Sequence, residues 1–176
     1  MRIVATLFSA SFLLAVAAPL AAQTAGPSKA DMSAMTSCLQ SIQAEQEKYE
    51  KLSEKAREKA DPPQEAASCI GAVSATCQEK SKGDENKALL TCNNREIAVW
   101  NAILEGGLKE FMKEAKPDEK AAMEKAHAAW QAYRDARCAF AGIDNKEDKG
   151  LAAALDSACR LDQTARHALW IDVREQ

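Results

Sequence analysis

The sequence predicts an all-α protein of about five helices, arranged as a disulfide-stapled antiparallel bundle with a C-terminal helical hairpin. Apolar residues recur at steps of three and four along most of the 176 residues, which is the spacing of one helix face. No segment alternates apolar and polar residues as a half-buried strand does. Six cysteines form an even set, which in an exported chain indicates three disulfides.

The first residues have the composition of an export signal. Arg2 supplies a positive charge, an apolar run extends to Ala18, and small residues around Ala22 suit cleavage. A membrane anchor is the alternative, but the run is shorter than the roughly 20 apolar residues that span a bilayer. No cysteine follows closely, so we expect a periplasmic or secreted protein without a lipid or membrane anchor. The predicted parts are a signal peptide, a flexible lead and one helical domain: residues 1–22, 23–27 and 28–176.

The charge of the chain restricts its partners. The formal net charge is −3, and removing the signal peptide with Arg2 makes it −4. This mild acidity argues against nucleic acid or an anionic membrane as the partner and allows a basic protein. About 150 mature residues suit a single domain.

The first long helix is predicted to begin at Ser28, which forms an N-cap pattern with Asp31. Apolar residues then recur at helical spacing, with charged residues between them. Pro62 and Pro63 stop the helix. Its apolar stripe consists of Met32, Met35, Leu39, Ile42, Tyr49, Leu52 and Ala56.

Two helices are predicted in the middle of the chain. A short one covers about residues 64–80, and the polar residues 81–84 end it. The next covers about residues 85–112 and contains Gly106 and Gly107. Each glycine costs about 1 kcal/mol relative to alanine in a helix, and the sequence leaves open whether the helix kinks or ends early at this point.

The last two helices are predicted to form an antiparallel hairpin. One begins at Pro117 and ends at Ala141, the polar residues 142–150 form the loop, and the other runs from about Leu151 almost to the C-terminus. Their apolar faces carry Met123, Ala126, Trp130, Tyr133 and Phe140, and Leu155, Ala158, Leu161, Ala165, Leu169 and Val173. We interpret three aromatic residues as core anchors rather than a ligand platform: Trp100, Trp130 and Tyr133.

The six cysteines have 15 possible connectivities, which the sequence alone does not resolve. Antiparallel packing of the hairpin brings Cys138 and Cys159 within disulfide range. The preceding helix pair suggests Cys77 with Cys92, and Cys38 with Cys69 remains by elimination. The absence of a C-x-x-C motif disfavours both a metal site and a redox pair.

Arg134 and Asp135 are the most conspicuous charged residues of the hairpin. Because adjacent helical residues diverge by about 100°, each is expected to pair with a different neighbour. Asp162 falls on the apolar face of the last helix, an unusual place for a carboxylate. We therefore hypothesise a bidentate ion pair between Arg134 and Asp162 across the hairpin.

No set of residues predicts catalysis, a cofactor or a metal. Glu124 and His127 have the E-x-x-H spacing of di-iron bundles, but the second such pair that these sites need is missing. The two histidines, His127 and His167, are therefore interpreted as polar surface residues. The cysteines are expected to be oxidised, and there is no G-x-S-x-G motif. The sequence predicts a protein that is not an enzyme.

Three segments resemble the family of exported bacterial domains similar to the lysozyme inhibitor LprI. They are residues 92–101 (CNNREIAVWN), 129–140 (AWQAYRDARCAF) and 159–166 (CRLDQTAR). The most specific part is the W-x-x-Y-R-D-x-x-C block, followed by a second cysteine, a threonine and an arginine. The resemblance covers roughly Cys69 to the C-terminus. It implies a small helical, disulfide-bonded envelope protein, with lysozyme inhibition in a few relatives.

Two functional hypotheses follow. The first is an exported binding protein that inhibits a lysozyme-type cell-wall hydrolase, for which an acidic protein gains association rate towards a basic partner. The second is a structural or small-ligand-binding envelope protein without an enzyme target. The sequence makes no prediction of oligomeric state. Under the first hypothesis the polar loop is expected to contact the partner through Asp144, Asn145, Lys146 and Lys149.

Overall fold

The computed structural model describes residues 26–172, and the regular secondary structure of this part is entirely helical, without strands. The all-α prediction is thereby confirmed. The predicted signal peptide, most of the lead and Val173 lie outside the described residues. No helix of the described part is long and apolar enough to cross a bilayer. The elements are α1 (Lys29–Glu50), α2 (Glu54–Arg57), η1 (Ala66–Cys69), α3 (Ala72–Lys80), α4 (Glu85–Glu114), α5 (Pro117–Ala141), η2 (Ile143–Asn145) and α6 (Lys149–Asp172), where η marks a 3₁₀ helix.

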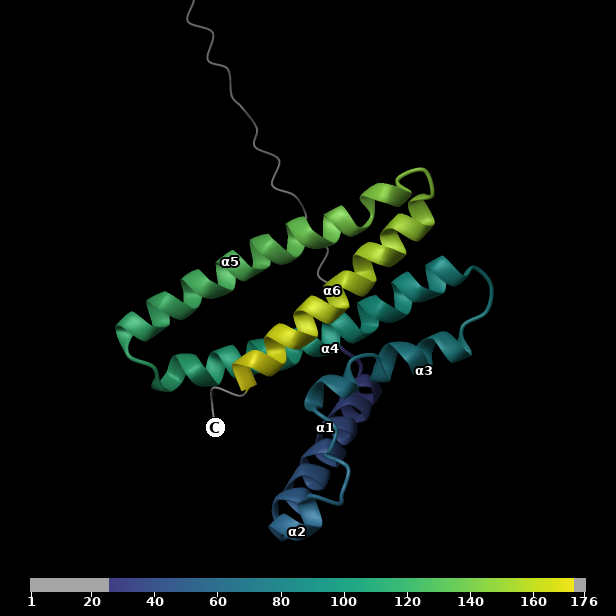
Figure 1. Ribbon diagram of the computed structural model, residues 1–176. Helices are drawn as coiled ribbons and strands as arrows, with labels where there is room; N and C mark the ends of the chain where they lie inside the picture. The colour runs from purple at the N-terminus through teal and green to yellow at the C-terminus, as the bar shows by residue number, and fades with distance from the viewer. Residues whose placement is uncertain (1–25, 173–176) are drawn as a thin grey trace, which may run out of the picture.

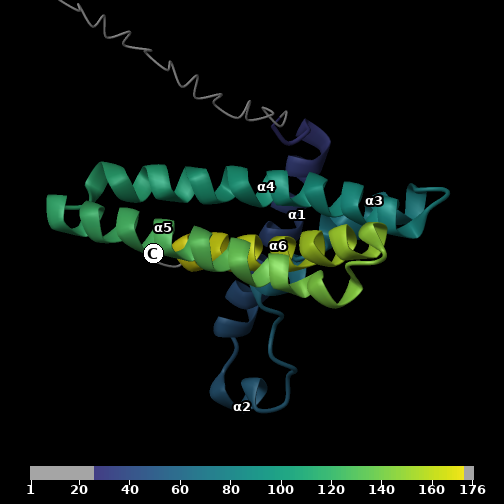
Figure 2. The same ribbon diagram turned by 90° about the horizontal axis from the view of Figure 1, so that it is seen from above.

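The long helices α4, α5 and α6 form the body of the molecule (Figure 1). The helix α6 packs against α4 on one side and against α5 on the other. The shorter α3 lies beside the first half of α4, and α1 contacts both α3 and α4. The end of α1 and the short α2 project away from this body in both views (Figures 1 and 2).

The hydrophobic core lies where α1, α4 and α6 meet. Trp100 of α4 is fully buried there, as predicted for a core anchor, and so is Met35 of α1. Helix α4 continues through Gly106 and Gly107 to Glu114 instead of ending early. A Cβ atom on Gly107 would lie 2.9 Å from a methyl carbon of Ile171, so the glycine allows α6 to approach closely. The other members of the core include Val99, Leu104, Leu161, Ala165 and Ala168.

Two helices end or begin differently from the prediction. The first helix ends at Glu50 rather than continuing to Ala56, and a separate turn of helix, α2, follows. The helix predicted over residues 64–80 is divided into η1 and α3 by Gly71, whose φ of 102° lies in the left-handed region. Only glycine adopts this conformation without strain. The helical periodicity was therefore correct, but the break within it was not predicted.

The prediction that Tyr133 anchors the core is wrong, and so is the placement of Phe140 on the buried face of its helix. Their side chains are 52% and 68% exposed. Helix α5 packs mainly on α6, so it buries only a narrow side and leaves the rest of its circumference in solvent. Ala158, expected on the apolar face of α6, is also exposed. The inward-facing side of α5 consists of Met123, His127, Trp130, Arg134 and Cys138.

Candidate functional site on the α5–α6 hairpin

Three disulfides join helices that are close in the chain order. Cys138 of α5 binds Cys159 of α6, with 5.3 Å between their Cα atoms. The other two disulfides are Cys77–Cys92, which links α3 to α4, and Cys38–Cys69, which links α1 to η1. The helix order suggested the first of these, and the second had been reached by elimination. The hairpin is thus covalently closed about one turn from the end of α5.

A stack of aromatic rings holds the open end of the hairpin together. The rings of Trp130 and His167 are 3.8 Å apart and nearly parallel, and Trp170 continues the stack beyond His167 at 5.3 Å. Nδ1 of His127 and Nε2 of His167 are 3.2 Å apart, within hydrogen-bond distance. The guanidinium of Arg134 lies 4.8 Å from the ring centroid of Trp130, a favourable cation–π distance.

The interpretation of the two histidines as surface residues is therefore wrong. They are the only histidines of the chain, and they meet across the hairpin. A repeated H-x-x-W pattern, in His127 to Trp130 and His167 to Trp170, is the sequence signal that marks them. Glu124 of the E-x-x-H motif is exposed, and the described residues hold no group of three or more potential metal ligands.

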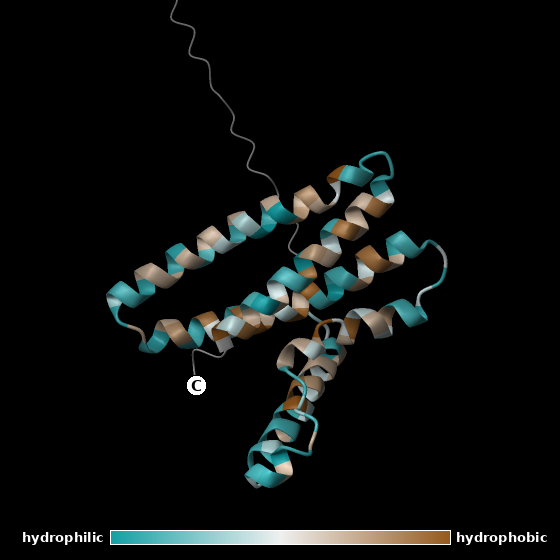
Figure 3. Ribbon diagram, in the orientation of Figure 1, coloured by the Kyte–Doolittle hydropathy of each residue, from teal (hydrophilic) through white to brown (hydrophobic). Residues whose placement is uncertain are grey.

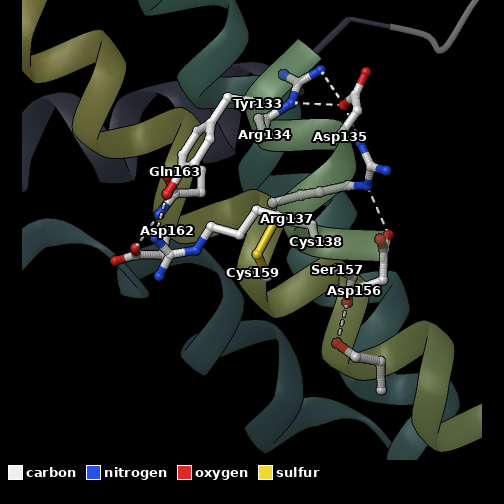
Figure 4. Close-up of a disulfide and its surroundings, with 12 residues drawn as sticks. Tyr133, Arg134, Asp135, Arg137, Cys138, Asp156, Ser157, Cys159, Asp162 and Gln163 are labelled. Carbon is white, nitrogen blue, oxygen red and sulfur yellow. Dashed lines mark hydrogen bonds and ion pairs between the residues drawn. A yellow bond between two sulfur atoms is a disulfide. The ribbon is translucent and has the colours of Figure 1, made fainter. Parts of the chain in front are cut away.

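The charged residues of the block form a chain of ion pairs, but the Arg134–Asp162 hypothesis is wrong. Arg134 donates to its neighbour Asp135 at 3.0 Å, and Arg160 of α6 donates to the same carboxylate at 2.6 Å. Asp162 instead accepts from Arg166, one turn further along α6, at 2.7 Å. Figure 4 shows Asp162 on the other side of the disulfide from Arg134 and Asp135. The flexible side chain of Arg134 bends towards Asp135, so these adjacent residues pair with each other, contrary to the prediction.

Burial and charge shift several pKa values in the hairpin. Burial raises the pKa of Asp135, but the hydrogen bonds and charges of Arg160 and Arg134 outweigh it and lower the pKa below its ordinary value. Burial is also the main reason why the pKa of His167 falls from 6.5 to about 4, with further contributions from the charges of His127 and Arg134. The pKa of His127 is lowered by burial and by Arg134.

These shifts predict that acid weakens the folded state between pH 6.5 and pH 4. Since the pKa of His167 is lower in the folded state, the unfolded chain binds its proton first, and stability that is present above pH 6.5 is lost as the pH falls. A shift of this size corresponds to at most about 3 kcal/mol. The ring is only half-buried, so solvent screening reduces the expected loss to about 1–2 kcal/mol.

Urea unfolding at several pH values measures this loss. His167→Gln removes this ring and should make the curve shallower between pH 6.5 and pH 4, where the lowered pKa of His127 leaves a smaller decline. The free energy of unfolding should still decline below about pH 4. The pKa values of the Asp135 and Asp31 carboxyls are lowered in the folded state, so their contribution to stability is lost in that range. A wild-type curve that is flat from pH 7 to pH 4 would contradict the prediction.

The flank of α5 next to its buried side presents aromatic and cationic side chains to solvent. We call Tyr133, Arg137, Phe140 and the adjoining Ile143 of η2 the outer face. Arg137 Nη1 donates to the Tyr133 hydroxyl at 2.7 Å, and its guanidinium lies 5.9 Å from the ring centroid. Ile143 is 53% exposed. Figure 3 shows strongly hydrophobic colour where α5 meets the turn.

The turn between α5 and α6 is short and ordered. The carboxylate of Asp148 accepts from the backbone N–H of Leu151 at 2.9 Å and so caps the start of α6. Of the residues predicted to contact a partner, Asp144, Lys146 and Lys149 are exposed, whereas Asn145 is half-buried. Their place at the tip of the hairpin is compatible with partner binding, which stays a prediction.

A buried carboxylate outside the hairpin escaped the sequence analysis. Glu96 of α4 is fully buried. It accepts from the backbone N–H groups of Gly71, Val73 and Ser74 at 2.7, 3.0 and 2.7 Å. It also accepts from Nε1 of Trp100 at 2.9 Å. Glu96 therefore caps the N-terminus of α3, where Gly71 has no side chain to do so.

Comparison with known proteins gives one result. A family model described as lysozyme inhibitor LprI matches residues 77–171. This range contains α4, α5, nearly all of α6, the end of α3, and two of the three disulfides. Neither a curated protein nor a solved structure matches the chain.

Proposed function

The chain belongs to the family described as lysozyme inhibitor LprI, whose model matches more than half of it, and from this premise we propose that it is an exported binding protein that inhibits a lysozyme-type cell-wall hydrolase. An inhibitor acts by binding, so the proposal requires a preformed surface rather than catalytic groups. The resemblance of the hairpin block to this family, predicted from the sequence over Cys69 to the C-terminus, is confirmed by the match over residues 77–171.

The rigidity of the hairpin is the observation that carries this proposal. A disulfide closes the end near the turn, and the stack of Trp130 on His167 closes the other. Both devices fix the relative position of α5 and α6, so little conformational freedom is lost when the surface meets a partner. The three disulfides also suit a protein that works outside the cytoplasm.

Charge supports a basic partner. The chain has a formal net charge of −3, which accelerates encounter with a cationic lysozyme at low salt. Within this acidic chain, Lys146 and Lys149 are exposed at the tip of the hairpin. Glycoside hydrolases of this kind carry a pair of carboxylates in their cleft, and the two lysines are complementary to them.

Calorimetric titration of the oxidised protein into purified lysozymes of several classes tests the proposal. We expect saturable binding of at least one class, weaker at higher salt, together with loss of its activity on cell walls. Absence of both heat and inhibition across the panel would reject the proposal. The alternative, a structural or small-ligand-binding envelope protein, would then remain.

A further inference from the structure

We propose that the outer face of α5 is the surface that docks on the lysozyme-type hydrolase, with Arg137 directed at the carboxylates of its cleft. This inference rests on the proposed function and specifies the binding surface within it. It moves the main contact from the turn, where the sequence placed it, to the helix that leads into the turn. The residues concerned are Tyr133, Arg137, Phe140 and Ile143.

Exposure of large apolar side chains distinguishes this face. Tyr133, Phe140 and Ile143 are 52%, 68% and 53% exposed. Tyr133, Arg137 and Phe140 follow one another at steps of four and three, so they lie on one side of the helix. Packing inside the chain does not require large aromatic rings here, because α5 contacts α6 through the neighbouring strip of Met123, His127, Trp130, Arg134 and Cys138. A clustered apolar surface with a polar rim is typical of a protein-binding site.

The residue types also fit an interface rather than a solvated helix. Tyrosine and arginine are enriched among residues that dominate binding energy, and aromatic rings are enriched at the centres of interfaces. Tyr133 and Arg137 are already joined by a hydrogen bond of 2.7 Å. Both side chains are thus ordered before binding, which lowers the entropic cost of the contact. The whole face lies within residues 77–171, the range that matches the inhibitor family.

Arg137 identifies the chemistry of the partner. A guanidinium has five N–H donors and binds carboxylates in a bidentate manner. Arg137 can therefore keep its bond to Tyr133 and still bind a carboxylate. The cleft of a glycoside hydrolase supplies two carboxylates, roughly 5–10 Å apart, between walls that bind sugar rings. Aromatic side chains such as Tyr133 and Phe140 are suited to those walls, because sugar-binding walls accept flat apolar surfaces.

Three variants and a matched control test the face. The double variant Tyr133→Ala, Phe140→Ala should raise the inhibition constant about 30-fold or more, and Arg137→Ala about 10-fold or more. Arg137→Lys should recover only part of this loss, because an ammonium does not form the bidentate contact. Gln131→Ala is the control, since Gln131 is exposed on α5 but points away from the outer face. It should change inhibition by less than about 2-fold.

The measurement is inhibition of the lysozyme class that binds most tightly in the panel. All variants change exposed residues, so their urea midpoints should stay close to wild type and show that folding is intact. Wild-type inhibition that is unaffected in the double variant and in Arg137→Ala would overturn the docking face and leave the proposed function standing. A panel in which the wild type inhibits no lysozyme would overturn both.

Two further outcomes would also overturn the docking face. One is a loss of inhibition only in Lys146→Ala, Lys149→Ala, which would return the contact to the turn. The other is a wild-type dimer that becomes a monomer in the double variant without a change in inhibition, which would make the face a contact between copies of this chain. Sedimentation velocity of both proteins at several concentrations distinguishes this case.

Discussion

Glu96→Ala is expected to lower the free energy of unfolding by about 3–5 kcal/mol. Glu96 is fully buried and accepts four hydrogen bonds. Its removal leaves three backbone N–H groups at the start of α3 and the indole N–H of Trp100 without an acceptor in the protein interior. Each buried, unsatisfied donor is costly, and the lost carboxylate also compensated the positive end of the α3 dipole. Urea unfolding at pH 7 measures the loss.

Two control variants divide this effect into its parts. Glu96→Gln preserves the shape and one acceptor oxygen, but its NH₂ group faces N–H donors, so we expect a loss of about 1–3 kcal/mol. Trp100→Phe removes the indole donor and should cost less in a Glu96→Gln background than in wild type, because the two groups interact. A loss below about 1 kcal/mol for Glu96→Ala would show that water or a rearranged α3 satisfies these donors.

Removing the Cys38–Cys69 disulfide is expected to cost about 4 kcal/mol. The two cysteines are separated by 31 positions, the longest loop of the three disulfides, and in the chain-entropy model the stabilisation increases with loop length. The double variant Cys38→Ala, Cys69→Ala opens the covalent loop between residues 38 and 69, and so increases the conformational entropy of the unfolded chain. The proposed inhibition should persist in this variant, because the proposed docking face on α5 lies elsewhere.

The matched control is Cys77→Ala, Cys92→Ala. This pair is separated by 15 positions, so the same model predicts a smaller loss of about 3 kcal/mol. Urea unfolding of both double variants, compared with wild type, gives the two losses. A reversed order would mean that packing around the cysteines, rather than loop entropy, determines the stabilisation.

The helices and the disulfides were predictable because both follow from local information. Ser28 accepts from the backbone N–H of Asp31 as the N-cap pattern predicted, and α5 begins at Pro117. Once the helices and their order are known, antiparallel packing of neighbours leaves few cysteines within reach of each other. The predicted antiparallel hairpin thus suggested Cys138 with Cys159, whereas Cys38 with Cys69 was left by elimination.

The errors concern the orientation of helices about their own axes, which local patterns do not determine. Tyr133 lies three residues after Trp130, so the two side chains differ in direction by about 60° around the axis of α5. Because only a narrow strip of α5 is buried, this difference leaves the ring of Tyr133 exposed while the ring of Trp130 is stacked. The same uncertainty misplaced Arg134, which stacks on Trp130 rather than crossing to Asp162. The roles of Glu96 and of the two histidines arise from contacts between helices distant in sequence, which periodicity within one helix does not reveal.

The order of the disulfides affects how the chain is oxidised. The first and second, third and fourth, and fifth and sixth cysteines are paired, so the three covalent loops neither overlap nor enclose one another. A chain that crosses a membrane from its N-terminus, and meets an oxidant as it emerges, exposes each native pair before the following pair arrives. Consecutive oxidation alone then yields the native connectivity, and reshuffling of mispaired thiols, which takes minutes to hours without a catalyst, is not required.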